Sequence, residues 1–148
     1  MVSEVAPIVL YLRHIVEPED LLIIEEPEAH LHPASQTALA EILCKLVNAR
    51  LGVAITTHSE FFIQQISNLI VASQVGAEAV ERVGLPPEAV LAPEKVGVYL
   101  FRMDPGTQGR VVEELPVSRQ SGVSEASFID VAEVLYNQSI KLDRETTE

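Results

Sequence analysis

Two adjacent glutamates follow an unbroken aliphatic run in the segment LLIIEEPEAHLHP, residues 21–33. Neighbouring carboxylates that alternate in direction at the end of a strand suit two different tasks. One carboxylate can hold a magnesium ion through its water shell, and the other can orient or deprotonate an attacking water molecule. Glu25 and Glu26 are therefore the first candidates for a reactive site, and a histidine nearby could contact a terminal phosphate.

The residues around these acids predict a parallel β-α-β unit. Leu21–Ile24 is apolar at consecutive positions, which is typical of a strand covered on both faces, so we expect a central strand of a parallel sheet. A helix should begin after Pro33 and end at the stretch Arg50–Gly52, and Val53–Thr56 should form the second strand. The crossover is expected to be right-handed.

A histidine, His58, follows the second predicted strand. Because open α/β sheets bind ligands at the carboxyl ends of their strands, His58 should lie close to Glu25 and Glu26. Ser59 is a candidate N-cap for the next helix. The expected apolar face of that helix comprises Phe62, Ile63, Ile66, Leu69 and Ile70.

The rest of the chain predicts smaller elements arranged around this unit. We expect a helix over 4–16, a short helix within the proline- and glycine-containing segment 73–95, a hairpin of Val96–Arg102 with Arg110–Pro116, and a last helix capped by Ser124 whose apolar face includes Tyr136. The predicted fold class is α/β, with a parallel β-α-β core flanked by helices and a C-terminal hairpin and helix. Residues 1–148 should form a single domain, with the core over 1–72, an excursion over 73–95 and the hairpin and helix over 96–148.

The composition narrows the class of protein. The chain has 148 residues, 47% of them hydrophobic, and a formal net charge of −12. This acidity disfavours direct nucleic-acid binding, because a protein that binds phosphate needs a basic surface. No apolar run reaches the roughly 20 residues of a membrane span, so we expect no membrane insertion and a cytoplasmic location. The single cysteine, Cys44, lies on the apolar side of a predicted helix and is interpreted as a packed thiol.

Two segments resemble a known family. LLIIEEPEAHLHP is similar to a Walker B strand running into a D-loop, and VAITTHSE, residues 53–60, is similar to the strand that carries the switch histidine of ABC-type ATPases. The similarity is to soluble AAA ATPases of the RecF-like, SMC-like and overcoming-lysogenization-defect-like branch rather than to transporter subunits. It implies a partial P-loop NTPase fold with ATP and Mg²⁺ as cofactors.

The resemblance also implies roles for individual residues. Glu25 would take the place of the metal-binding Walker B aspartate, although its longer side chain changes the reach to a magnesium-bound water. Glu26 would be the catalytic glutamate and His58 the switch histidine. The D-loop would run from Glu28 to His32, so that His30 and His32 would contact nucleotide across a dimer; a plain surface turn before Pro33 is the alternative for these two histidines.

The signature segment of the family would fall at residues 1–4, where Ser3 could be the serine that contacts the partner's γ-phosphate. No Gly-Gly accompanies Ser3, and an N-cap is the alternative.

A phosphate-binding loop requires Gly-Lys, yet Lys45, Lys95 and Lys141 follow Cys, Glu and Ile. The chain thus resembles the C-terminal half of an ATPase, inactive alone.

Without the strand that carries the phosphate loop, the edge beside Leu21–Ile24 would be open. We therefore expect a homo-oligomer or a Walker A-bearing partner chain.

Two other function classes remain open at this stage. The chain could be a non-catalytic remnant or a regulatory module that dimerises or binds a partner, which the absence of Gly-Lys favours. It could also be a metal-dependent hydrolase with zinc or manganese, since imidazole and carboxylate groups are competent ligands. The residues available to that site are Glu25, Glu26, His30, His32 and His58. A C-terminal nuclease domain is excluded because residues 96–148 contain no Asp-x-Asp cluster.

Overall fold

The computed structural model describes Leu10, His14, residues 16–104, Gly106, residues 109–124, residues 136–138 and Ile140. The α-helices are α2 (Pro33–Asn48), α3 (Glu60–Val71) and α4 (Ala77–Arg82), and short 3-10 turns lie at Ala72–Gln74, Pro87–Ala89 and Pro93–Lys95. The strands are β1 (Leu21–Glu25), β2 (Gly52–Thr56), β3 (Val98–Met103), β4 (Arg110–Leu115), β5 (Val117–Ser118) and β6 (Gly122–Val123).

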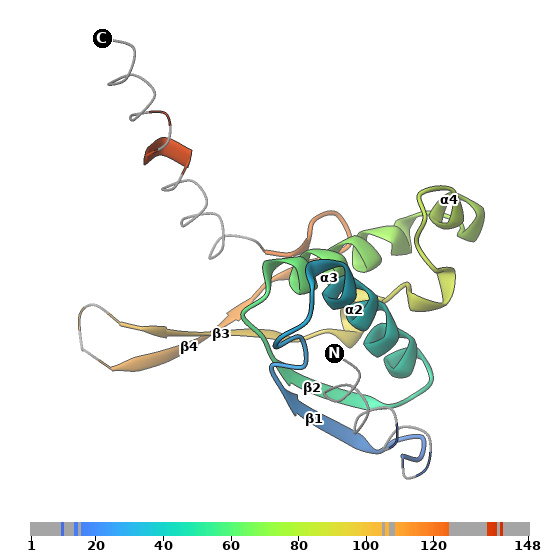
Figure 1. The fold of residues 1–148 in the computed structure, drawn as a ribbon, viewed down its shortest axis with the longest axis horizontal. Coiled ribbons are helices and arrows are strands. Elements are labelled where there is room, and N and C mark those ends of the chain that lie inside the picture. The colour runs from blue at the N-terminus through green and yellow to red at the C-terminus, as the bar shows by residue number, and fades with distance from the viewer. Residues whose placement is uncertain are drawn as a thin grey trace.

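The predicted parallel strands and their connecting helix are confirmed. β1 and β2 pair in parallel, with Leu22 opposite Val53 and Ile24 opposite Ile55. Helices α2 and α3 lie side by side on one face of this pair (Figure 1). Val53 and Ile55 pack against the buried cluster of Leu39, Ala40, Leu43 and Phe62, which the two helices supply.

The expectation of a central strand covered on both faces is wrong for β1. Leu21 is 62% exposed and Ile23 is 70% exposed, whereas Leu22 between them is buried. Successive side chains point to opposite faces of a strand, so the helices cover only the face of Leu22. Among the described residues β1 pairs with β2 alone, which leaves its other edge open, as expected if a neighbouring strand is missing.

Local signals in the sequence explain where α3 begins and where α2 ends. The Ser59 hydroxyl caps α3 by accepting a hydrogen bond from the Phe62 backbone N–H at 3.1 Å, as predicted. At the end of α2, Arg50 adopts a φ of 74°, the left-handed conformation that closes helices. The glycine of the predicted stop, Gly52, instead begins β2.

The segment 73–95 contains the predicted short helix, α4, and contributes to the core. Ala89 and Leu91 are buried in one cluster with Cys44, Leu69 and Ile70. The Asn48 side-chain amide fixes this segment to α2 by donating hydrogen bonds to the carbonyls of Glu88 at 3.1 Å and Val90 at 2.7 Å. The excursion is therefore part of the packed fold.

The predicted hairpin is also confirmed. β3 and β4 pair antiparallel and project from one side of the body, opposite to α4 (Figure 1). The helix expected over 4–16 falls largely outside the described residues, within which Leu10 and His14 are helical and exposed. The final helix is likewise described only at 136–138 and Ile140, where Tyr136 is 67% exposed instead of lying on a buried face. No helix in the described part of the chain has the length and apolar character needed to cross a membrane.

Candidate active site at the carboxyl ends of the parallel strands

Glu26 is held at the carboxyl edge of the sheet by the end of the neighbouring strand. β1 ends at Glu25, and Glu26 adopts a φ of 43°, a left-handed conformation that is uncommon for a residue with a side chain. The Glu26 backbone N–H donates to the Thr56 carbonyl at 2.9 Å and lies 3.2 Å from the Thr56 hydroxyl. The chain therefore turns at Glu26, so Glu25 and Glu26 do not form the simple strand alternation expected from the sequence.

The structure brings Glu26 and His58 together. His58 Nε2 lies 3.7 Å from Glu26 Oε1. The His58 side chain is 90% exposed and that of Glu26 is 54% exposed, so both groups are open to solvent and to a ligand. An acid and an imidazole from the ends of two parallel strands thus meet where the sequence predicted that they would.

The Glu25 side chain points away from Glu26 and His58. It shares the uncovered face of β1 with Leu21 and Ile23 because all three lie at alternate positions of the strand. Its carboxylate forms no ion pair within the described ranges, and its side chain is exposed. The structure therefore joins only Glu26 and His58 of the three groups expected to converge.

Glu28 is a residue of this site whose importance the sequence analysis did not recognise. It is only 5% exposed, and its Oε1 accepts hydrogen bonds from the Thr57 hydroxyl and from the His58 backbone N–H, the latter at 3.2 Å. The Thr57 hydroxyl oxygen in turn accepts from the Ser59 backbone N–H at 3.1 Å. Glu28 thereby connects the turn after β1 to the turn after β2 and fixes the backbone from which His58 extends.

The two histidines of the expected D-loop differ in their surroundings. His32 is the N-cap of α2, and its Nδ1 accepts from the Ala34 backbone N–H at 3.3 Å. His30 is exposed and has a φ of 63°. Both histidines thus lie between β1 and α2, and neither contacts Glu26 or His58 in the described structure. Their contact with nucleotide across a dimer stays a prediction. Ser3, the candidate signature serine, lies outside the described residues.

The acid and histidine side chains are too dispersed to form a metal centre by themselves. In the part of the chain that the structure describes, no group of three or more histidine, cysteine, aspartate and glutamate residues could hold a metal ion. The metal-dependent hydrolase considered from the sequence requires such a group. Its candidate ligands are all described, and the arrangement does not support this alternative.

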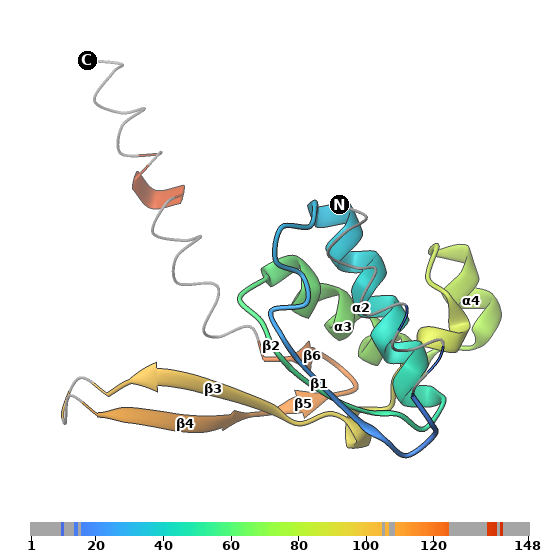
Figure 2. The same cartoon turned by 60° about the horizontal axis from the view of Figure 1, so that its bottom comes forward.

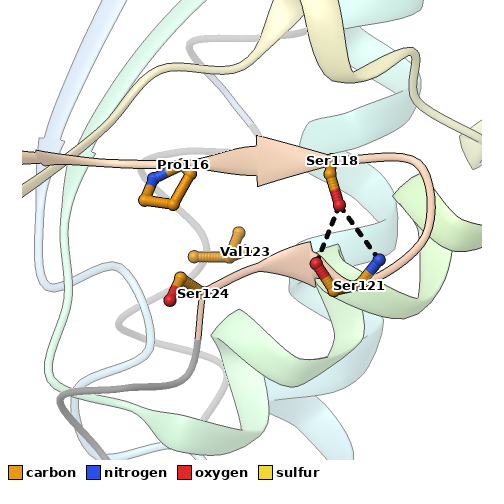
Figure 3. Close-up of a pocket in the computed structure, with 5 residues that line it drawn as sticks. All are labelled: Pro116, Ser118, Ser121, Val123 and Ser124. Carbon is orange, nitrogen blue, oxygen red and sulfur yellow. Dashed lines mark hydrogen bonds between the residues drawn. The ribbon is translucent and has the colours of Figure 1, made fainter.

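A separate surface pocket lies at the β5–β6 hairpin and contains none of these residues. It has a volume of about 380 Å³ and is lined by Pro116, Ser118, Ser121, Val123 and Ser124 (Figure 3). The Ser118 and Ser121 hydroxyls lie 2.8 Å apart and hydrogen-bond each other, as the close-up shows. With no charged side chain among its described lining residues, this pocket offers less chemistry than the carboxyl edge of β1 and β2.

Comparison with known proteins relates part of the chain to an ATPase family. Residues 5–63 match the family described as AAA ATPase domain, a match that supports an AAA-type ATPase domain and includes Glu26, Glu28 and His58. The chain is also 42% identical over 53 residues to Protein ea59 of Escherichia phage lambda. That alignment covers 35% of this chain and 10% of the relative, so the similarity spans a small part of the phage protein. No solved structure matches the chain.

Proposed function

We propose that this chain provides the C-terminal portion of an ATPase domain of the ABC type, in the RecF-like, SMC-like and overcoming-lysogenization-defect-like branch. The observation that carries the proposal is the meeting of Glu26 and His58 at 3.7 Å on the carboxyl edge of two parallel strands. The AAA ATPase domain match over residues 5–63 supports it independently. In this proposal, ATP hydrolysis requires a phosphate-binding half that the present sequence does not contain.

Each of the site residues has a chemical role in the proposed reaction. Glu26 would orient the attacking water molecule and accept its proton, and its exposed carboxylate leaves room for that water. The His58 imidazole would donate a hydrogen bond from Nε2 to a phosphoryl oxygen. Glu25 would hold magnesium through the water shell of the ion. Ser3, His30 and His32 would contact nucleotide bound by a partner.

The described residues fit one side of a site for magnesium and ATP. Glu26 provides a carboxylate for the attacking water, and the exposed His58 can reach a phosphate. Glu25 lies on the uncovered face of β1, so the magnesium that it would hold through water must approach from that face. The bound magnesium would neutralise charge on the phosphates. The opposite side is not provided, because no Gly-Lys pair occurs in the sequence and no Lys or Arg side chain pairs with Glu26 among the described residues. The chain by itself should therefore bind ATP very weakly.

The missing side and the open edge favour a partner chain that carries Walker A. β1 exposes its unpaired edge beside Leu21 and Ile23, which are 62% and 70% exposed. A strand added along this edge would satisfy the free backbone groups of β1, and the partner would also have to pack on the face of Leu21 and Ile23 to bury them. The same observation favours a second candidate function, a non-catalytic module that binds a partner through β1 without hydrolysing ATP.

The first test is calorimetric titration of magnesium and ATP into the purified chain. We expect no binding tighter than about 1 mM, since an affinity of about 1 mM corresponds to only about 4 kcal/mol and the phosphate loop is absent. Micromolar binding would contradict the argument from the missing loop.

The second test measures phosphate release after the chain is combined with a Walker A-bearing chain encoded by the same or a neighbouring gene. Replacing a catalytic base reduces turnover by roughly 10²–10⁴-fold, so Glu26→Gln should abolish the gain in activity. The matched control is Glu60→Gln, an exposed acid at the start of α3 that should leave the rate unchanged. A complex that forms but gives no Glu26-dependent turnover would support the non-catalytic candidate instead.

A further inference from the structure

One face of the β3–β4 hairpin is apolar and uncovered. Tyr99, Phe101 and Met103 occupy alternate positions of β3 and are 57%, 73% and 59% exposed. Val112, which pairs with Phe101, lies on the same face and is 56% exposed. The opposite face is anchored in the protein, because Leu115 is buried and Val98 packs against the core. Figure 2 shows the hairpin extending away from the body.

Such a hairpin would gain stability if another protein surface packed on its exposed apolar face. A two-stranded antiparallel pair is marginally stable in water by itself, and contiguous exposed apolar surface marks sites of association. Each aromatic side chain can bury roughly 150–250 Å² when fully covered. Together the four apolar residues would bury on the order of 400–500 Å² on each copy, below the roughly 800 Å² of a standard interface. The association should be weak.

The charged residues on this face indicate which kind of surface would pack against it. Arg110 pairs with Met103 at the tip of the hairpin, and Glu114 pairs with Tyr99 at its base. Cross-strand partners point to the same face, so the apolar patch has a positive group at one end and a negative group at the other. Neither Arg110 nor Glu114 forms an ion pair with another described residue. Two copies of this face packed against each other in opposite strand directions would therefore bring unlike charges together at both ends.

We propose that the exposed face of the hairpin, residues Tyr99, Phe101, Met103, Arg110, Val112 and Glu114, binds a second copy of this chain. The twofold axis would lie in the plane between the two hairpins and cross the strands at the Phe101–Val112 pair. This axis places Arg110 of each copy opposite Glu114 of the other and stacks the apolar side chains between the ion pairs. A symmetric dimer uses the same patch on both subunits, so both ion pairs form at once.

The alternative twofold axis, parallel to the strands, fits less well. It would place tip against tip, so that Arg110 would face the Arg110–Met103 end of the other copy. Two positive groups would then gather at one end of the interface and two negative groups at the other, and like charges in proximity oppose association. The charge pattern therefore selects the antiparallel arrangement of the hairpins.

The test is sedimentation equilibrium of the whole chain at increasing concentration. The small interface predicts a dimer with a dissociation constant on the order of 100 µM. Phe101→Ser should remove the dimer without unfolding the protein, because the side chain is 73% exposed. Arg110→Glu and Glu114→Arg should each weaken association about tenfold, since each change places like charges together at two symmetric contacts. The double variant, with both charges exchanged, should restore it.

Recovery of the dimer in the double variant identifies this interface, because association through an unrelated surface would not depend on the charges at Arg110 and Glu114. A chain that stays monomeric at all concentrations would overturn the proposal, as would a double variant no better than the single ones. Ile23→Thr is the matched control, an exposed apolar side chain on β1 that should leave the dimer unchanged. Loss of the dimer in Ile23→Thr alone would assign self-association to the β1 face and overturn the hairpin assignment. Circular dichroism confirms folding of every variant.

Discussion

Replacing Glu28 should destabilise the fold and release the backbone that carries His58. The Glu28 carboxylate is 5% exposed and accepts hydrogen bonds from the Thr57 hydroxyl and the His58 N–H. Glu28→Ala removes both acceptors and leaves a cavity. Glu28→Gln keeps a carbonyl oxygen and nearly the same volume but removes the negative charge. The two variants therefore separate the effect of the acceptor from that of the charge.

The expected magnitudes follow from these contacts. A hydrogen bond to a charged group contributes about 1.5–3 kcal/mol, and two are lost in Glu28→Ala. This loss is partly offset, because the buried Glu28 Oε2 has no hydrogen-bond partner among the described residues, and its desolvation cost of about 1–3 kcal/mol disappears with the carboxylate. We expect a net destabilisation of about 1–3 kcal/mol for Glu28→Ala. Glu28→Gln keeps both hydrogen bonds at roughly half their strength, a loss of about 1.5–3 kcal/mol, and the lower desolvation cost of a neutral amide reduces the net loss to about 0.5–1.5 kcal/mol.

Urea unfolding measures these differences. With a slope of about 2 kcal/mol per molar urea, Glu28→Ala should lower the midpoint by about 0.5–1.5 M. Hydrogen exchange of the His58 amide should accelerate in Glu28→Ala beyond the change in global stability and remain slow in Glu28→Gln. Glu81→Ala, an exposed acid on α4, is the control and should stay within about 0.5 kcal/mol. Unchanged stability and unchanged His58 exchange in Glu28→Ala would refute the reasoning.

Two further predictions concern the core. Gly122→Ala should destabilise the protein by about 3 kcal/mol or more in urea unfolding, because φ is +70° and an added Cβ would lie 2.5 Å from Ser67 Cβ. Gly76→Ala is the control and should cost at most about 1 kcal/mol, because an added Cβ at this N-cap would meet no atom within 4 Å beyond the local backbone. Burial, reinforced by Glu41, raises the pKa of the Cys44 thiol from 9.0 to about 11, so it should resist iodoacetamide at neutral pH unless the protein unfolds. Because the pKa of the Cys44 thiol is higher in the folded state, the folded protein holds this proton more tightly than the unfolded chain does. The resulting contribution to the free energy of unfolding is fully present below pH 9.0 and is lost as the pH rises towards about 11. Labelling faster than unfolding would contradict the assignment.

The elements that depend on local chemistry were predictable from the sequence. Helical spacing and the Ser59 cap predicted α3, and the alternating residues around the turn predicted the hairpin. The meeting of Glu26 and His58 was also predictable, since it follows from two parallel strands ending at one edge. These features need only short stretches of sequence and one general rule of sheet topology.

What was not predictable depends on tertiary surroundings. The aliphatic run of β1 predicts two covered faces, but whether Leu21 and Ile23 are covered depends on what packs there. The difference between Glu26 and Glu28 is also hidden in the sequence, because both are glutamates beside Pro27. The left-handed turn at Glu26 leaves its own side chain exposed, and Glu28 lies buried against Thr57. No spacing rule distinguishes a buried acid from an exposed one in this segment.

The open edge of β1 and the proposed phosphate site belong to the same strand. Glu25 ends β1 on its uncovered face, and Glu26 follows directly, with its Oε1 3.7 Å from His58 Nε2. A strand paired along the free edge of β1 would deliver its own carboxyl end beside these acids, because neighbouring parallel strands end at one edge. A phosphate-binding loop at that point would provide the positive and backbone N–H groups that Glu26 and His58 lack. The stability of the sheet and the chemistry of the site would then require the same partner, so a β1 edge blocked by proline should abolish both.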